Sequence, residues 1–155
     1  MLLRMIPDAL ANIWPDIKGH IAEALPAGER GEAALNKLLE SLLQNVATCW
    51  ISYDPKNGNK PNFAMVLTPL YDSFIEEKNL NIYSITRFDD MDLKTSNRMW
   101  LEGFVALKKY MNEFGYAKLI GHFDEENVRS LKMARRFGAK VRYYIEIDMN
   151  AELEV

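Results

Sequence analysis

The chain has 155 residues, of which 48% are hydrophobic and 26% are charged, and its formal net charge is -3. This length predicts one domain over residues 1–155, and the composition predicts a sizeable core in an ordinary globular protein. The weak negative charge argues against a general nucleic-acid or membrane binder. No apolar run approaches the ~20 residues that a membrane-spanning helix needs.

The chain has one cysteine, Cys49, which lies in an apolar run without a cluster of metal-ligand residues around it. It cannot form an internal disulfide, and an inert buried thiol is favoured over a nucleophile. We therefore expect a reducing compartment and no metal site.

Changes in the hydrophobic period divide the chain into ten expected elements. Isoleucines at four-residue intervals predict a first helix, which Pro15 should divide into two short pieces because proline removes a helix hydrogen bond. An Asn-Gly pair at 57–58 predicts a hairpin between two apolar strands. In chain order the elements are a strand at 2–6, helices at 7–25 and 35–46, strands at 49–53, 63–68 and 80–88, a helix at 95–114, a strand at 117–123, a helix at 127–137 and a strand at 141–147.

The order of these elements predicts an α/β (α+β) fold. The central hairpin implies antiparallel pairing, whereas the long helix at 95–114 joins strands 80–88 and 117–123 as a parallel crossover. We expect a mixed central sheet of about six strands with helices on both faces. Thr95 or Ser96 can cap the long helix, and Gly115 can end it.

The segment NVRSLKMARRFGA, residues 127–139, is a short helix with a polar cap between two expected strands. Together with the element order, it resembles the GNAT family, acyltransferases that use acetyl-CoA. Asn127 stands where many members have an asparagine that opens a late helix. Ser130 matches a small residue three positions on, and Gly138 matches a glycine eleven positions on, while Ala139 replaces the usual phenylalanine. The resemblance implies a GNAT-like fold for nearly the whole chain.

The residues at two places depart from the pattern of that family. The family holds the pyrophosphate of acetyl-CoA at the start of the long helix, on the motif Arg/Gln-x-x-Gly-x-Gly/Ala. Here the motif falls on residues 95–100, where Thr95, Arg98 and Trp100 replace its three defining residues. Trp100 should crowd a cofactor that needs bare backbone, although Arg98 could meet a phosphate directly. Ala134 replaces the tyrosine with which many members protonate the departing thiolate.

These departures favour a GNAT-fold protein with a degenerate acetyl-CoA site, no cofactor and no catalytic residue. On this hypothesis the chain resembles the degenerate GNAT-like proteins of bacteriophages. It would be a structural pseudoenzyme that binds protein partners in the virion or the host cytoplasm, and not a membrane or nucleic acid. The alternative is an active N-acetyltransferase that binds acetyl-CoA between strands 80–88 and 117–123, with Arg98 and Asn127 as cofactor-binding residues. Backbone N–H groups would then stabilise the oxyanion formed when an acceptor amine attacks the thioester.

Three other groups of residues have both a plain and a functional interpretation. Asp89 and Asp90 end the strand before the long helix, where the family often has a catalytic carboxylate, but a solvated turn is favoured. His122 lies in the strand before the last helix, and a structural role is favoured. The third group is a basic helix face, for which solvation is favoured over docking to an acidic partner, at Arg129, Lys132 and Arg136.

Overall fold

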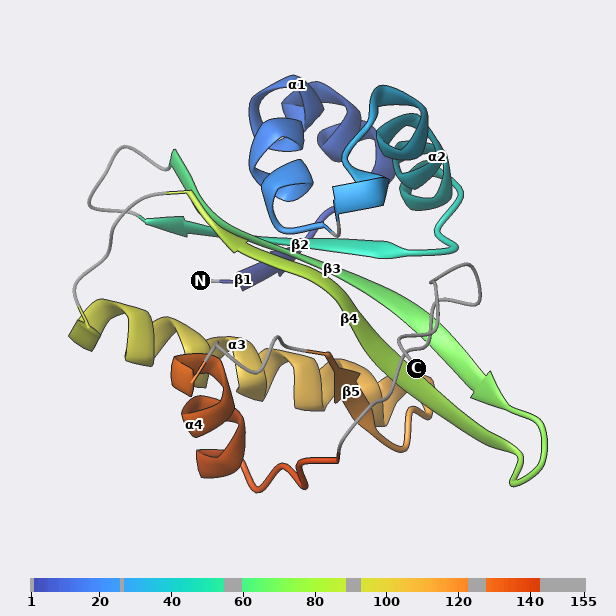
Figure 1. The fold of residues 1–155 in the computed structure, drawn as a ribbon, viewed down its shortest axis with the longest axis vertical. Coiled ribbons are helices and arrows are strands. Elements are labelled where there is room, and N and C mark those ends of the chain that lie inside the picture. The colour runs from blue at the N-terminus through green and yellow to red at the C-terminus, as the bar shows by residue number, and fades with distance from the viewer. Residues whose placement is uncertain (1, 26, 55–59, 89–92, 123–127, 143–155) are drawn as a thin grey trace, which may run out of the picture. The chain divides into compact units, whose positions relative to one another are not determined.

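The chain folds into two compact units, Met1–His122 and Phe123–Val155, and each is described by itself. The expectation of a single domain over residues 1–155 stays a prediction. Figure 1 shows the ribbon of the computed structural model. The structure describes residues 2–25, 27–54, 60–88, 93–122 and 128–142.

The first unit is built around a five-stranded mixed sheet with the strand order β1-β2-β3-β4-β5 (Figure 1). The first four strands pair antiparallel, and the last pairs parallel to β4, as the crossover predicts. The sixth strand, expected at 141–147, falls largely outside the described residues. The strands are β1 (Leu2–Arg4), β2 (Thr48–Asp54), β3 (Lys60–Asp72), β4 (Glu77–Arg87) and β5 (Leu119–Gly121).

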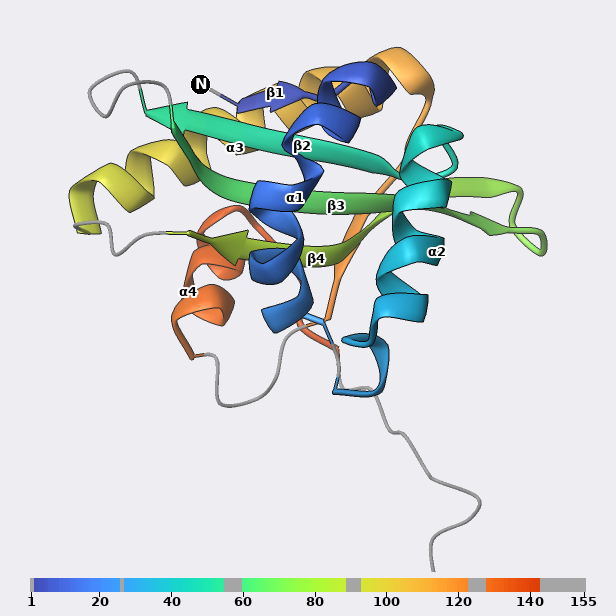
Figure 2. The same ribbon diagram turned by 90° about the horizontal axis from the view of Figure 1, so that it is seen from above.

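Helices cover both faces of this sheet, which confirms the predicted layers. Helices α1 (Pro7–Glu23) and α2 (Glu32–Leu43) lie on one face, and α3 (Leu93–Phe114) lies on the other (Figures 1 and 2). Alternate residues of β2 and β3 point to opposite faces, so both strands are apolar almost throughout. The core under α1 and α2 includes Cys49, Ile51, Ala64 and Val66, and the core under α3 includes Trp50, Phe63, Met65 and Leu67.

Helix α1 is one continuous helix of 17 residues, so the expectation that Pro15 divides it is wrong. Pro15 and Ala11, whose carbonyl loses its helix donor, are both exposed, so water can bond to that carbonyl. Packing on the sheet holds the helix together on both sides of the proline. The buried side chains of α1 are Leu10, Trp14, Ile17 and Ile21.

The long helix α3 ends as predicted but begins earlier. Gly115 has φ 71°, and the Tyr116 N–H donates to the Met111 carbonyl at 2.8 Å, which is a glycine cap. The helix begins at Leu93, two residues before the expected start. Phe114, the last residue of the helix, is 46% exposed.

The hairpin of β3 and β4 is longer than the two strands predicted from the sequence, because its pairing extends to Asp72 and Glu77. The sequence predicted that β3 ends at residue 68, directly before Pro69. The structure accommodates it because its partner Leu80 donates its N–H to Lys118, on the β5 side. By the antiparallel pattern, Pro69 then turns its nitrogen away from β4, toward an edge where no donor is required.

The second unit contains helix α4 (Val128–Arg136), close to the predicted range. Gly138 ends it with φ 80°, and the Ala139 N–H donates to the Ala134 carbonyl at 3.1 Å. Asn127, the expected cap, lies outside the described residues.

The described residues contain neither a membrane-spanning helix nor a metal-binding cluster. None of their helices has the length and apolar character to cross a membrane. Within the same ranges, no group of three or more His, Cys, Asp or Glu residues could hold a metal ion.

Replacement of Pro15 by alanine should stabilise the protein, because it restores a helix hydrogen bond at an exposed position. We expect the free energy of unfolding to rise by about 2 kcal/mol, after allowance for the greater freedom of the unfolded chain. Pro7→Ala is the matched control, since proline at the start of a helix costs no hydrogen bond. Urea denaturation of both variants measures the difference, and equal effects would contradict this account.

The Cys49 thiol should be unreactive in the native protein. It is 1% exposed, and burial raises its pKa to about 12, so little thiolate forms at neutral pH. Ellman's reagent at pH 8 should find no thiol in the folded protein and one thiol in guanidinium chloride. Rapid reaction of the native protein would show that Cys49 is accessible.

Candidate functional site

The pairing of β4 with β5 ends halfway along β4. The two strands pair only at Leu80↔Leu119, Asn81↔Ile120 and Ile82↔Gly121, while β4 continues to Arg87. In the part of the first unit that the structure describes, the remaining edge of β4 has no strand partner on this side. Figure 1 shows β5 as a short strand beside the middle of β4. Backbone donors and acceptors along residues 83–87 are therefore candidates for binding an extended ligand.

A β-bulge lies at the point where this pairing ends. Val66 of β3 pairs with Ser84, whereas Leu67 pairs with Ile82, so Tyr83 is an extra residue in β4. The bulge resets the alternation of side chains along the strand. Ile82 and Ile85 are three residues apart, yet both pack against the core under α3.

Tyr83 contacts the connection between α1 and α2. Its hydroxyl donates a hydrogen bond to the carboxylate of Glu29, which ends the short 3-10 helix η1 (Ala27–Glu29). Burial, together with the hydrogen bond and the negative charge of Glu29, raises the pKa of Tyr83 to about 12. The phenol is therefore neutral at physiological pH and keeps the proton that it donates to Glu29.

Sequence reasoning missed both Tyr83 and Glu29. Nothing in the sequence joins two residues that are 54 positions apart. The spacing of Ile82 and Ile85 was an available signal, because a strand without a bulge places residues three apart on opposite faces.

Polar side chains extend along β4 on the same face as Tyr83. Ser84 is buried, and the Asn81 side-chain amide donates to the Thr68 hydroxyl at 3.3 Å. Within the described ranges, three buried amide oxygens have no protein partner. Because buried polar groups are normally bonded, these oxygens are suited to water or a polar ligand. Two of them belong to Asn79 and Asn81 on β4, and the third belongs to Asn62 on β3.

The expected pyrophosphate motif, residues 95–100, lies inside helix α3, which begins at Leu93. Its first-turn N–H groups, which have no helix acceptor, belong to Leu93–Thr95 and not to residues 98–100. Trp100 is partly buried, and its ring meets Phe63 edge-on, with centroids 6.0 Å apart. The Trp100 side chain therefore packs toward the sheet, about two turns after the start of the helix. The expectation that it crowds the cofactor stays a prediction. Arg98 is exposed, and its Nε lies 3.8 Å from the Glu102 carboxylate.

Of the other candidate site residues from the sequence, the structure describes only some. His122 is exposed and directly follows β5. Asn127, Asp89 and Asp90 lie outside the described residues. The assignment of Arg98 and Asn127 to cofactor binding therefore stays a prediction.

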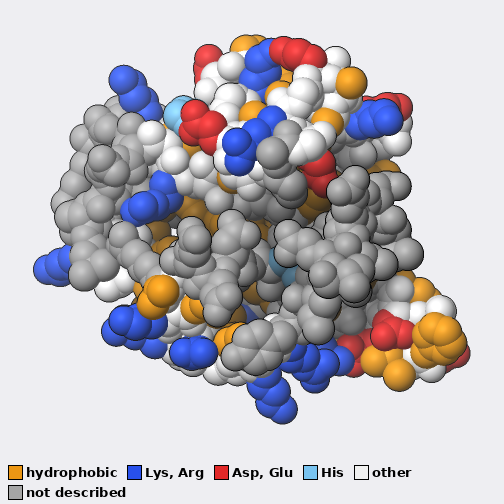
Figure 3. Space-filling view, viewed as in Figure 1, with side chains coloured by type: hydrophobic (Ala, Val, Ile, Leu, Met, Phe, Trp, Pro, Cys, Tyr) orange, Lys and Arg blue, Asp and Glu red, His pale blue; other side chains and the backbone are white. Residues whose placement is uncertain are grey.

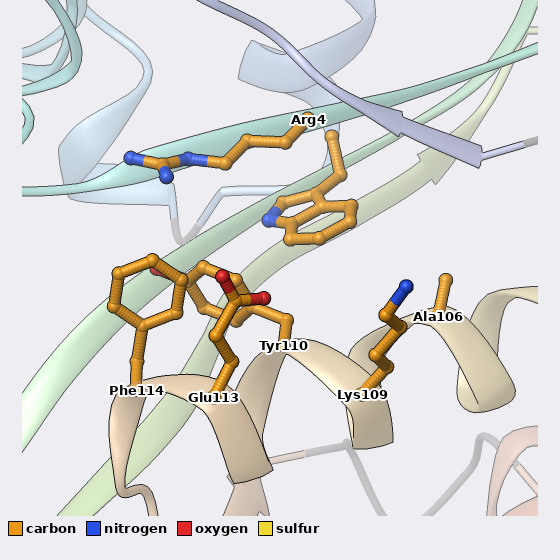
Figure 4. Close-up of a pocket in the computed structure, with 7 residues that line it drawn as sticks. Arg4, Ala106, Lys109, Tyr110, Glu113 and Phe114 are labelled. Atoms are coloured by element: carbon orange, nitrogen blue, oxygen red, sulfur yellow. The ribbon is translucent and has the colours of Figure 1, made fainter.

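A shallow cavity of about 370 Å³ lies at a different edge of the sheet, between β1, β2 and α3 (Figure 4). The Arg4 guanidinium covers it, 5.5 Å from the Tyr110 ring centroid and 6.0 Å from that of Phe114. Trp50 meets Tyr110 edge-on at 5.2 Å. The part of the sheet beyond Ile82, where β4 continues without β5, is called the β4–β5 opening. Because β1 and β5 are the opposite edges of the sheet, the cavity is not part of this opening.

Comparison with known proteins finds similarity in structure and not in sequence. The chain matches no protein-family model. No curated protein matches its sequence. A probable acetyltransferase superposes with a TM-score of 0.72 at 10% identity, covering 99% of each chain. A GCN5-related N-acetyltransferase from Ralstonia eutropha JMP134 gives 0.70 at 13% identity, covering 97% of this chain and 99% of that one. An aminoglycoside acetyltransferase from an uncultured soil metagenomic sample gives 0.66 at 14% identity, covering 99% and 96%.

These neighbours overturn one expectation from the sequence and confirm another. The expectation that the chain uses no cofactor is contradicted, because its structural neighbours are acetyltransferases, which imply the use of acetyl-CoA. The expected fold class is confirmed along nearly the whole chain. The chain therefore has the fold of the GNAT acetyltransferases.

Proposed function

We propose that the chain is an acetyl-CoA-dependent N-acetyltransferase. The observation that carries the proposal is the β4 edge beyond Ile82, which has no described strand partner and begins at a bulge whose Tyr83 contacts a carboxylate. A backbone edge and a carboxylate at one point are what acyl transfer to an amine needs. The acetyltransferase fold of the chain supports the same conclusion.

The residues at this opening fit the cofactor. Acetyl-CoA would supply an acetyl thioester to the acceptor amine. The backbone of residues 83–87 of β4 would bind the extended arm of acetyl-CoA in the same way as it would bind a neighbouring strand. The first-turn N–H groups of α3 would hold the pyrophosphate. Arg98 can assist, because helical side chains lean toward the N-terminus and its ion pair with Glu102 is exposed and weak.

Glu29 and Tyr83 would serve the acceptor. An ammonium group must lose a proton before its nitrogen can attack, and the Glu29 carboxylate would take that proton. Tyr83 would hold the carboxylate in place through its hydrogen bond. As the new C–N bond forms and the C–S bond breaks, a backbone N–H at the bulge would stabilise the oxyanion. The nitrogen would lose its second proton to solvent as it becomes an amide. Solvent would also protonate the departing thiolate, because Ala134 cannot do so.

A second candidate is a GNAT-fold module that acts by binding a protein partner, such as a phage structural protein. It is supported by the sequence directly before α3, where Asp89, Asp90 and Asp92 would compete with a pyrophosphate for the positive end of the helix. The lack of a tyrosine at Ala134 supports it as well.

Arg98→Ala should weaken acetyl-CoA binding about tenfold, since a hydrogen bond between charged groups is lost. Lys108→Ala, another exposed change on α3, should leave binding unchanged. Isothermal titration calorimetry measures both affinities. Absence of heat with millimolar acetyl-CoA would count against the enzyme and favour the second candidate. Equal losses in the two variants would remove Arg98 from the site.

Glu29→Gln should lower kcat/KM for the amine by about 100-fold, because the proton acceptor is lost. The affinity for acetyl-CoA should not change. Glu32→Gln is the matched control, since Glu32 pairs with Lys18 on the surface. Activity is followed by release of the CoA thiol with a panel of primary amines from pH 5 to 9.

The Tyr83→Phe variant separates a proton acceptor from a positioning residue. Tyr83→Phe should keep part of the activity that Glu29→Gln loses, because the phenol only holds the Glu29 carboxylate in place through its hydrogen bond. Full activity of Glu29→Gln would exclude the mechanism.

A further inference from the structure

The tip of the β3–β4 hairpin, residues 69–76, carries an unusual number of exposed apolar side chains. Phe74 is 97% exposed, and three neighbouring large side chains are about half exposed or more. These four side chains are adjacent in the hairpin, whereas exposed apolar side chains on a monomer surface are normally scattered singly. They are Leu70, Tyr71, Phe74 and Ile75.

The shape of the turn does not depend on these apolar side chains. Asp72 forms it, because its carboxylate accepts a hydrogen bond from the Phe74 N–H at 3.0 Å. Glu76 adopts φ 52°, and β3 and β4 remain paired to the last residues before the turn. Polar residues at positions 74 and 75 would make the same turn, so Phe74 and Ile75 are better explained by a contact with another surface.

The hairpin tip is acidic as well as apolar. Figure 3 shows hydrophobic and acidic side chains together at this end of the hairpin, at the lower right of the view. Glu77 pairs with Lys118, and the Lys78 ammonium lies 4.2 Å from the Tyr116 ring centroid. Asp72 and Glu76 therefore dominate the charge of the tip, and a complementary surface is basic with apolar side chains.

The chain itself carries such a surface in its second unit. Residues 128–142 contain six basic residues and no acidic residue, in a chain whose net charge is -3. Val128 and Val141 are exposed within this segment. Of its basic side chains, those described as exposed are Lys132, Arg135, Arg136, Lys140 and Arg142.

We propose that the hairpin tip of one copy docks on the basic segment 128–142 of a second copy. Contact between two tips is disfavoured, because it would bring Asp72 and Glu76 of both copies together. Pairing between two β3 edges is disfavoured as well, because Pro69 has no N–H to donate. Opposite charge and apolar side chains on both surfaces leave the tip and the basic segment as the matching pair.

The size of this contact sets its strength. Four large apolar side chains at one tip, with the surface that they cover on the second copy, would bury on the order of 1,000 Å² in total, at the low end for a specific interface. The dimer is therefore concentration-dependent, with a Kd in the micromolar range or weaker, and salt weakens it. This inference does not rest on the proposed enzyme activity.

Sedimentation velocity of the full chain from 1 to 200 µM, in 50 and 500 mM NaCl, tests the proposal. We expect dimers that dissociate on dilution and at high salt. Phe74→Ser should weaken dimerisation at least tenfold without a change in the circular dichroism spectrum. Leu101→Ser, an exposed apolar change on α3, is the matched control and should have no effect. A monomer at every concentration, or a dimer that Phe74→Ser leaves intact, would overturn the proposal.

A charge exchange identifies the surface on which the tip docks. Glu76→Arg and Arg135→Glu should each weaken the dimer by several-fold through like-charge repulsion. The double variant should regain most of the loss, because the opposite charges are again paired. Failure of the double variant to recover would exclude the basic segment as the docking surface.

Discussion

One extra residue in β4 organises the candidate site. Because Tyr83 adds a residue to the strand without a partner on β3, the side chains before and after it are placed on faces that a regular strand would not allow. Ile82 and Ile85 both pack under α3, while Tyr83 turns to the other face and meets Glu29. The parallel pairing with β5 stops at the residue before the bulge. A strand edge without a described partner, a carboxylate and the start of a helix thus belong to one compact unit.

The sequence predicted the parts of the fold that depend on local patterns. The hairpin after β2, the crossover through α3 and the glycines that end two helices follow from hydrophobic period and turn chemistry, which act over a few residues. The errors arose where packing overrides a local rule. Pro15 stays inside a helix because four buried side chains hold it on the sheet, and β3 runs through Pro69 because that position needs no donor. The contact of Tyr83 with Glu29 was out of reach, since it depends on how α1 and α2 are placed over β4.

The function that we propose differs from the one that the sequence favoured, for a structural reason. The departures at Arg98 and Trp100 argued against the family's reaction only on the assumption that those residues form the first turn of the long helix. The helix begins at Leu93, so the donors of its first turn come from other residues, and Trp100 packs against Phe63. The structural neighbours are acetyltransferases, and the fold that the chain shares with them supports the proposed use of acetyl-CoA. What remains unusual is the missing tyrosine at Ala134, which bears on how the thiolate leaves and not on whether an acetyl group can be bound.

The order of the elements along the chain also determines when the β4–β5 opening can form during synthesis. Strands β2, β3 and β4 are joined by short connections and can pair as soon as they emerge, because closing a short loop costs little entropy. Strand β5 can join only after the whole of α3 has been made, since the helix separates it from β4. Long-range parallel pairing of this kind forms slowly. The edge of β4 is therefore exposed on the nascent chain until that last step, and the region with the candidate chemistry is the last of its unit to become native.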